Sequence, residues 1–330
     1  MRPTQPSHVL KASKTDVFLV SNLTNIRYLS GVEVSTGFVL IKPKSMTLLV
    51  DGRYTEAAKR SARKGVKVAD IDALKRLLRG VERCGFEAQD ITVARLASWK
   101  KLLNTKFVQS KGIIEEFRRS KEPDEIKNFR KAQRITHKMM DRIPATLKSS
   151  ITEKQLAEKL RQWAVELGAD ELSFDPIVAF GTNSSSPHHH PTSRKLTKGQ
   201  VVQIDVGARV NGYCADQSRV FFTGKITAEQ KRVYDAVERA KSESEAAVKA
   251  GVTNHKLDTI ARDILKEEGL NQYFTHSLGH GVGLDIHEGA SLSQKSKKQK
   301  LLKNEIITIE PGVYISGKFG MRLEDEIIVM

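Results

Sequence analysis

The sequence predicts an α+β protein of two domains, from its length, its composition and its apolar pattern. A chain of 330 residues is too long for one ordinary core and long enough for two. Hydrophobic residues make up 39% of it and charged residues 28%, which is typical of compact globular proteins. Short apolar runs alternate with helical patterns along both halves, so we expect helices and strands in each domain.

The first half predicts a small α/β domain. Between residues 16 and 107, turn residues and a helical stretch at 55–64 interrupt three strand-like runs: 17–20, 38–41 and 46–50. A polar, proline-bearing segment, 119–124, then precedes a helix with an apolar face. We place the boundary there, which gives domains of residues 1–118 and 119–330.

The second half predicts three further helices with clear ends. Two of them begin with a capping box, in which a threonine and a glutamine satisfy each other's backbone N–H groups: Thr152 with Gln155, and Thr227 with Gln230. The third is expected to run from an N-cap at Asn254 to a left-handed stop at Gly269.

Composition also restricts location and partners. No run approaches the roughly 18 apolar residues of a membrane-spanning helix, the polar first 14 residues do not form a secretory signal, and Cys84 and Cys214 lie far apart. We therefore expect a cytoplasmic protein that does not enter the membrane.

The net charge of +16 raises the question of whether the protein binds nucleic acid. The one dense basic run, 295–303, lacks interleaved aromatics, so we interpret the charge as a solvated surface and keep RNA binding as the alternative.

Two strand-like segments, 200–210 and 213–222, form a predicted hairpin around Asn211-Gly212, a strong signal for a two-residue turn. If Val210 faces Tyr213, the numbers of paired residues sum to 423.

That register places two aspartates on one face of the hairpin. Asp205 opposes Ser218 and Asp216 opposes Gly207, which leaves room there. The aspartates are then diagonal neighbours with Cα atoms roughly 7–8 Å apart, a distance that a metal ion can bridge between carboxylates. On the hairpin alone, two solvated edge aspartates remain the alternative.

Three histidines, His276, His280 and His287, follow within twelve residues. The first two have the spacing of a helical zinc site, but glycines at 279, 281 and 283 make a helix there improbable, and their spacing is not that of a dinucleotide loop. The combination favours a binding site over structural histidines.

The last strand-like segments, 306–314 and 320–329, carry further candidate ligands. Arg322 and Glu324 alternate with apolar or outward residues and so share one face. Glu310 ends an apolar strand, where an unpaired carboxylate is costly. The simpler alternative is that Arg322 pairs with one of these glutamates.

Together, four carboxylates and one imidazole form a candidate metal site: Asp205, Asp216, His280, Glu310 and Glu324. Oxygen-rich ligands favour Mn²⁺ or Co²⁺ over a thiolate-type zinc site, with Zn²⁺ as a further alternative. Four negative charges balance two divalent ions, which can share and activate a water molecule. The predicted chemistry is hydrolysis.

These residues resemble, motif by motif, the creatinase/prolidase-type "pita-bread" metallopeptidases. The first half also carries Asn25-Ile-Arg-Tyr-Leu-Ser-Gly31 and Asp51-Gly-Arg-Tyr-Thr-Glu56, which are similar to the family's non-catalytic domain. The resemblance implies a small creatinase/prolidase-like α/β domain, followed by a pita-bread catalytic domain whose curved antiparallel sheet is flanked by helices. Methionine aminopeptidases share the ligands but normally lack the first domain.

Carried over residue by residue, the resemblance implies that Asp205 chelates one metal, that His280 and Glu310 bind the other, and that Asp216 and Glu324 bridge both. A metal-bridging hydroxide would attack the scissile carbonyl.

The remaining roles are also implied by the resemblance. Glu310 is the expected proton shuttle, and His188 and His287 would hold the substrate and stabilise the oxyanion. His276 would line the proline-side pocket, and Arg322 would stabilise Glu310 or the substrate. Two neighbouring histidines are expected to be exposed loop residues: His189 and His190.

The function implied is an Xaa-Pro aminopeptidase, a homodimer with two divalent ions, Mn²⁺ being the first choice. It would act on short proline-containing peptides and cleave the bond before the proline. Prolidase, which is limited to dipeptides, is the nearest alternative. A metal-free relative, creatinase-like or RNA-binding, is the alternative from another class.

Overall fold

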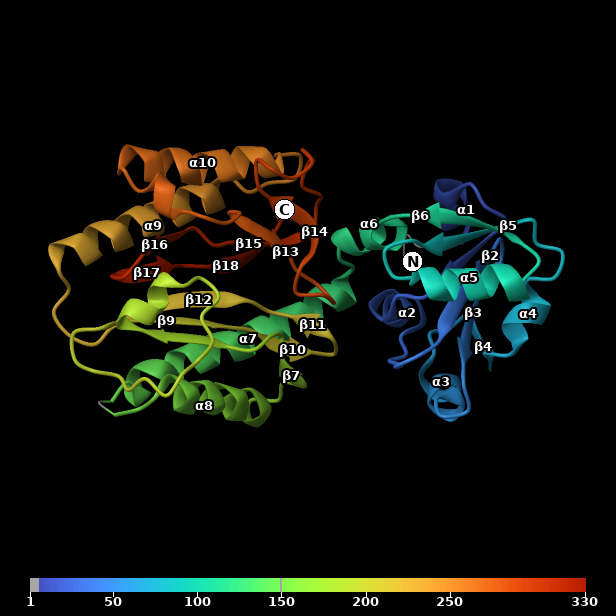
Figure 1. Cartoon of the computed structure of the whole chain (residues 1–330), viewed down its shortest axis with the longest axis horizontal. Coiled ribbons are helices and arrows are strands. Elements are labelled where there is room, and N and C mark those ends of the chain that lie inside the picture. Colours follow the sequence, from blue (N-terminus) through green and yellow to red (C-terminus); the bar gives the residue numbers. More distant parts are fainter. Residues whose placement is uncertain (1–5, 149) are drawn as a thin grey trace. The chain divides into compact units, whose positions relative to one another are not determined.

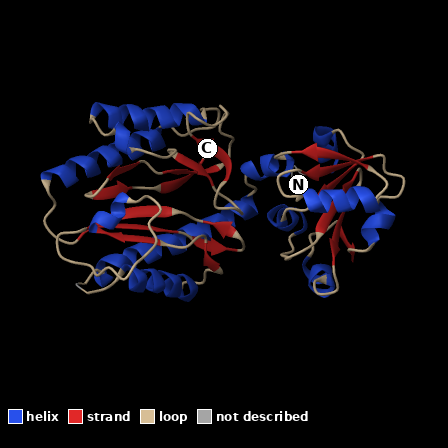
Figure 2. Ribbon diagram, in the orientation of Figure 1, coloured by secondary structure: helices blue, strands red, loops and turns tan. Residues whose placement is uncertain are grey.

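The computed structural model describes residues 6–148 and 150–330. The chain divides into two compact units, residues 1–118 and 119–330, and Figures 1 and 2 show that helices and strands occur in both. None of the helices in the described ranges is long and apolar enough to cross a membrane.

The first unit contains a six-stranded mixed sheet in the order β4-β3-β2-β1-β5-β6. Its strands are β1 Val17–Val20, β2 Phe38–Lys42, β3 Ser45–Val50, β4 Val66–Asp70, β5 Arg83–Glu87 and β6 Lys106–Ser110. Its helices are α1 Pro6–Ser13, α2 Leu23–Ser30, α3 Thr55–Ser61, α4 Ala73–Leu77, α5 Val93–Leu102 and α6 Ile113–Arg119, the last ending at the boundary. The three expected strands are therefore confirmed.

Helix α3 is shorter than the predicted 55–64, because the backbone turns extended at Ala62, with φ −59° and ψ 140°, and left-handed at Gly65, with φ +92°.

Four long helices build the second unit: α7 Pro123–Thr146, α8 Glu153–Glu166, α9 Ala228–Ala246 and α10 Asn254–Glu267. Both predicted capping boxes are present, at the starts of α8 and α9. The predicted N-cap of α10 was wrong by one residue, because the side chain of Thr253 accepts the hydrogen bond from the Lys256 N–H and Asn254 is the first helical residue. Gly269 adopts the expected left-handed conformation, with φ +67°.

The strands of the second unit pair antiparallel and lie between the helices, with α7 and α8 on one side and α9 and α10 on the other (Figure 1). They are β7 Glu171–Leu172, β8 Ile177–Phe180, β9 Val201–Val206, β10 Ala208–Val210, β11 Tyr213–Cys214, β12 Gln217–Phe222, β13 Gly279–Gly281, β14 Glu288–Leu292, β15 Ile306–Ile309, β16 Gly312–Ile315, β17 Phe319–Arg322 and β18 Asp325–Ile328. The predicted α+β fold, with antiparallel sheets flanked by helices, is confirmed.

Alternation along β9 explains how the fold presents polar groups to its interior. Val202 and Ile204 belong to the apolar core that also contains residues of α7 and α8. The intervening Gln203 and Asp205 therefore project from the other face of the strand, where both bond Arg322. A second core, formed with residues of α9 and α10, includes Ile307 and Ile309 of β15. The polar site is thus built between two apolar layers.

Candidate metal centre

The predicted hairpin register is confirmed on both sides of its turn. Val210 pairs with Tyr213, and Ser218 pairs with Asp205. The two strands change sheets near Gly207, where an added Cβ would overlap the backbone carbonyl of Ala215. Gly207 is therefore needed for a close backbone approach, and our expectation that it leaves room opposite Asp216 was wrong.

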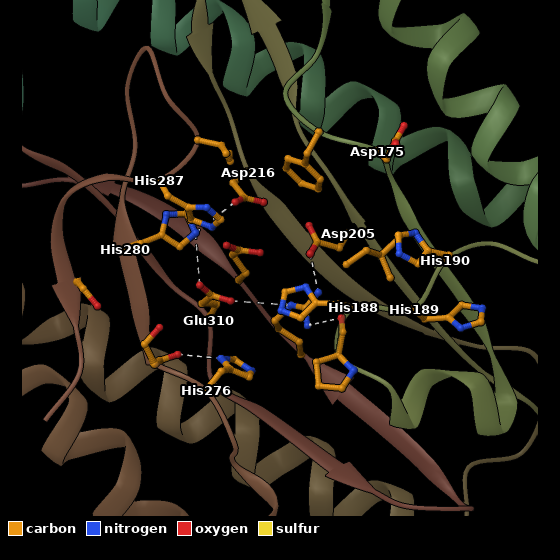
Figure 3. A pocket seen from close by; sticks show the side chains of 18 residues that line it. Asp175, His188, His189, His190, Asp205, Asp216, His276, His280, His287 and Glu310 are labelled. Carbon is orange, nitrogen blue, oxygen red and sulfur yellow. Dashed lines mark hydrogen bonds and ion pairs between the residues drawn. The ribbon is translucent and has the colours of Figure 1, made fainter. Parts of the chain in front are cut away.

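All five predicted metal ligands line one cavity of about 530 Å³ (Figure 3). Atoms of Asp216, His280 and Glu324 that can bind a metal lie within 4.8 Å of one another. The Nε2 atom of His280 is 3.5 Å from Asp216 Oδ2 and 3.5 Å from Glu310 Oε1. The fold thus gathers side chains from β9, the β11–β12 connection, β13 and the ends of β15 and β17.

Several oxygen atoms of this cluster have no hydrogen-bond partner. Within the described part of the chain, Asp205 Oδ1, Asp216 Oδ1 and Glu324 Oε1 are buried and accept no hydrogen bond. An unsatisfied buried carboxylate oxygen costs free energy, and a divalent cation would satisfy several at once. The residues present therefore fit a metal centre.

The charges of the cluster support the same conclusion. Burial, together with neighbouring carboxylates, raises the pKa of Asp216 and of Glu324 well above the ordinary values. Burial raises the pKa of Glu310 to about 7, although His280 and Arg322 oppose that rise. The cluster holds its full negative charge at neutral pH only when positive charge is brought among the carboxylates.

The imidazole of His280 is oriented as a ligand. Its Nδ1 lies 3.1 Å from the backbone oxygen of Gly281, so Nδ1 carries the proton and donates it. The lone pair of Nε2 then faces Asp216 and Glu310, the arrangement in which a histidine binds a metal.

Close backbone contacts hold His280 in a strand. A Cβ at Gly279 would overlap the Thr308 carbonyl, and one at Gly281 would overlap the Glu288 carbonyl. The expectation that this segment is not a helix is confirmed, because His280 lies in β13.

Arg322 lies closest to Asp205, with Nη2 2.5 Å from Oδ2, whereas its Nε is 4.0 Å from Glu310 Oε2. Its Nη1 donates to Tyr314 Oη at 2.6 Å, and its Nε donates to Ser218 Oγ at 2.9 Å. The guanidinium therefore braces a predicted ligand and is held by two hydroxyl groups. No role was assigned to Tyr314 from the sequence, because the alternation along a strand indicates which face an uncharged residue occupies but not which distant side chains it contacts.

His276 completes a chain of hydrogen bonds that begins at Arg322. Its Nδ1 is 2.8 Å from the Ser277 carbonyl and must donate, so its Nε2 accepts from Tyr314 Oη at 2.9 Å. Burial, with the positive charge of Arg322, lowers the pKa of His276 to about 3. The imidazole is therefore neutral at physiological pH, as its two hydrogen bonds require.

The remaining predicted histidines also line the cavity. The His287 ring lies 4.2 Å from the ring of His280, and burial together with His280 and His188 lowers the pKa of His287 to about 4. Of the two histidines expected to be exposed, His190 is exposed, but His189 is not. Its side chain is 13% exposed, and its Nε2 lies 2.9 Å from Glu153 Oε2. That expectation failed because the partner of His189 lies 36 residues away in the sequence.

Comparison with known proteins identifies the family. The model of metallopeptidase family M24 matches residues 127–330, and the model of the creatinase/prolidase N-terminal domain matches residues 7–120. The chain belongs to metallopeptidase family M24. The predicted resemblance is therefore confirmed, and M24 enzymes are hydrolases that use divalent metal ions.

Individual relatives divide between two activities. An Xaa-Pro dipeptidase of Pyrococcus horikoshii is 33% identical to this M24 chain and covers 95% of it and 90% of the relative. The structure of an Xaa-Pro dipeptidase from Bacillus anthracis has a TM-score of 0.95, with 31% identity over 98% of this chain and 94% of that chain. The structure of an X-Pro aminopeptidase from Thermotoga maritima has a TM-score of 0.89, with 31% identity over 97% of this chain and 94% of that chain.

Proposed function

We propose that this M24 metallopeptidase is an Xaa-Pro aminopeptidase, which removes the N-terminal residue ahead of proline from short peptides. The observation that carries the proposal is the cluster of buried carboxylate oxygens without hydrogen-bond partners, set in a cavity large enough for a small peptide. Relatives named for Xaa-Pro hydrolysis support the choice of peptide.

Two divalent ions, Mn²⁺ being the first choice, would be held by the five ligands: Asp205, Asp216, His280, Glu310 and Glu324. When bound, the ions lower the pKa of a water molecule and supply positive charge that stabilises the transition state. With the ions in place, Asp205 Oδ1, Asp216 Oδ1 and Glu324 Oε1 would gain the partners that they lack among residues 6–148 and 150–330.

Glu310 is the proposed proton shuttle. It lines the cavity beside the other proposed ligands, and its Oε1 is 3.5 Å from His280 Nε2, so a water activated there would lie within reach of a carboxylate that can accept and return a proton. We propose that Glu310 takes the proton of the attacking water and delivers it to the proline nitrogen as the peptide bond breaks. Arg322, 4.0 Å from Glu310 Oε2, favours the ionised form that begins the cycle.

His188 and His287 are proposed to hold the substrate. Both line the cavity, and the lowered pKa of His287 keeps that imidazole neutral at pH 7. A neutral imidazole can donate one N–H to the carbonyl oxygen and strengthen that hydrogen bond as negative charge develops there.

His276 is proposed to form the proline-side wall. It is neutral, it lies 5.1 Å from the Phe274 ring centroid in an edge-on contact, and its Nε2 is occupied by Tyr314. It therefore offers a largely apolar surface, which suits the pyrrolidine ring of proline.

Prolidase is the second candidate, and the relatives named as Xaa-Pro dipeptidases favour it. Side-by-side assays of Ala-Pro and Ala-Pro-Ala with Mn²⁺ separate the two. Release of the N-terminal alanine from the tripeptide, with Pro-Ala as the other product, supports the aminopeptidase. Cleavage of the dipeptide alone would replace it with prolidase. Ala-Ala-Ala is the control for proline selectivity, and size-exclusion chromatography with light scattering tests the proposed homodimer.

A further inference from the structure

His188 lies in the connection between β8 and β9, a loop that holds several hydrogen bonds of its own. Arg194 Nη1 donates to Thr182 Oγ1 at 2.7 Å and to Asn183 Oδ1 at 3.1 Å, which ties the two arms of the loop together. Gly320 N donates to Ser184 Oγ at 2.9 Å, so β17 also holds this loop. The loop is therefore an ordered part of the catalytic unit.

The centre of this loop's bonding is Glu153, the first residue of α8, whose side chain is fully buried. Its two carboxylate oxygens together accept five hydrogen bonds. Oε1 accepts from Phe180 N at 2.8 Å and Asn183 Nδ2 at 2.9 Å; Oε2 accepts from His189 Nε2 at 2.9 Å, Thr192 N at 2.9 Å and Thr192 Oγ1 at 2.6 Å. One side chain thus binds both arms of the loop.

The charge state of Glu153 follows from these partners. Burial acts to raise its pKa, but the hydrogen bonds outweigh burial and lower it below the ordinary value. Its position in the first turn of α8 adds the favourable field of a helix N-terminus. The carboxylate is therefore ionised and accepts only, which requires His189 Nε2 to carry a proton.

The two neighbours of His188 in the sequence are both fixed. The Pro187 carbonyl accepts from Arg322 Nη1 at 3.3 Å, and the His189 side chain bonds Glu153. In Figure 3, His188 lies nearer to Glu310 than His189 does. One bond on each side thus restrains the backbone from which His188 projects.

We propose that Glu153 is a positioning residue for peptide hydrolysis: it holds the loop so that His188 reaches the substrate. The proposal rests on the proposed function, since it assumes that His188 contacts the peptide. Glu153 is not among the residues that line the cavity, and none of the five hydrogen bonds described above comes from a proposed metal ligand, so its effect passes through His189 and the loop backbone.

The first test is a double-mutant cycle. Glu153→Gln keeps the shape of the side chain but turns an amide NH₂ toward groups that donate, so we expect kcat/KM for Ala-Pro-Ala to fall about 10- to 100-fold. The matched control is Glu158→Gln on the exposed face of the same helix, which should leave kcat/KM unchanged. In a His188→Ala background, Glu153→Gln should cause no further loss, because the interaction through which it acts is already gone. A full additional 10-fold loss in that background would overturn the proposal.

The second test does not depend on activity. In chelator-treated protein, the amides of Phe180 and Thr192 should exchange with deuterium at least about 10-fold faster in Glu153→Gln than in wild type, while amides of α10 keep their protection. Unchanged exchange at both amides would overturn the anchoring of the loop, even if the wild-type protein proves not to cleave Xaa-Pro peptides. A wild type without that activity, but with faster exchange in the variant, would refute only the proposed function and the link to His188.

Discussion

Two groups of buried carboxylates in the catalytic unit differ in one respect. Asp205, Asp216 and Glu324 each leave a buried oxygen without a hydrogen-bond partner among the described residues, whereas both oxygens of Glu153 are fully bonded. Burial alone therefore does not distinguish a ligand from an anchor. The two places differ in the satisfaction of the oxygens together with their clustering, because several unsatisfied buried carboxylates that line one cavity need a cation to compensate them.

The pKa shifts of the two groups point in opposite directions. Burial and mutual repulsion raise the pKa of Asp216 and of Glu324, whereas hydrogen bonds overcome burial and lower the pKa of Glu153. The folded protein therefore loses stability as Asp216 and Glu324 ionise and gains stability as Glu153 ionises. Substitutions that remove the charge should therefore change the free energy of unfolding in opposite directions at Glu324 and at Glu153.

The largest effect is expected for activity. The double substitution Asp216→Ala with Glu324→Ala should reduce hydrolysis of Ala-Pro-Ala to the level of the blank, because it removes both proposed bridging ligands. Circular dichroism and the unfolding of the first domain should remain as in wild type. Retained turnover in this variant would contradict the proposed metal mechanism.

The next effect is stabilisation by metal. Mn²⁺ at about 100 times its Kd should add about 2.7 kcal/mol per site to the free energy of unfolding of the chelator-treated protein. The gain should disappear in Glu324→Gln and persist in Glu153→Gln, as measured by denaturant titration. An equal stabilisation by Mn²⁺ in both variants would contradict the assignment of Glu324 as a metal ligand and of Glu153 as an anchor of the loop.

Neutralisation without metal should change stability in opposite directions. Glu153→Gln should lower the free energy of unfolding by about 2 kcal/mol, because groups that donate to the carboxylate lose their acceptor. Glu324→Gln in chelator-treated protein should raise it at neutral pH, because the carboxyl of Glu324 has to take up a proton on folding and the amide of Gln does not. Denaturant titrations of both variants beside wild type decide this, and a loss in both would refute the contrast.

The smallest effect is a pH dependence caused by Glu310. Its folded pKa of about 7 exceeds the ordinary 4.5, so the stability that its neutral form contributes is present below pH 4.5 and is lost as the pH rises to about 7. Chelator-treated wild type should therefore lose stability relative to Glu310→Gln across that window. The comparison with the variant is needed because the lowered pKa values of His276 and His287 produce the opposite trend. A constant difference between pH 4.5 and 7 would contradict the raised pKa.

Sequence alone predicted the parts of the site that depend on local rules. The Asn211-Gly212 turn specified the register, and strict alternation then placed Asp205 opposite Ser218, as observed. The capping boxes of α8 and α9 were equally local. Since Thr253 and Asn254 are both good N-cap residues, the sequence did not distinguish them, and the start of α10 was misplaced by one residue.

The missed features all depend on contacts between distant segments. Glu153 lies 27 to 39 residues from the groups that it accepts from, and no spacing rule connects the start of α8 to the loop that follows β8. Tyr314 accepts its hydrogen bond from Arg322 because β16 pairs with β17, a pairing that was not predicted from the sequence. The burial of His189 followed from Glu153 and could not be read from a run of three histidines.

Elemental analysis of the purified protein, loaded with Mn²⁺ and freed of excess ion, tests the central claim most directly. The account predicts two tightly bound divalent ions per chain in wild type and in Glu153→Gln, and loss of bound ions in the Asp216→Ala, Glu324→Ala variant. Fewer than one ion per chain in a wild type that still cleaves Ala-Pro-Ala would contradict it.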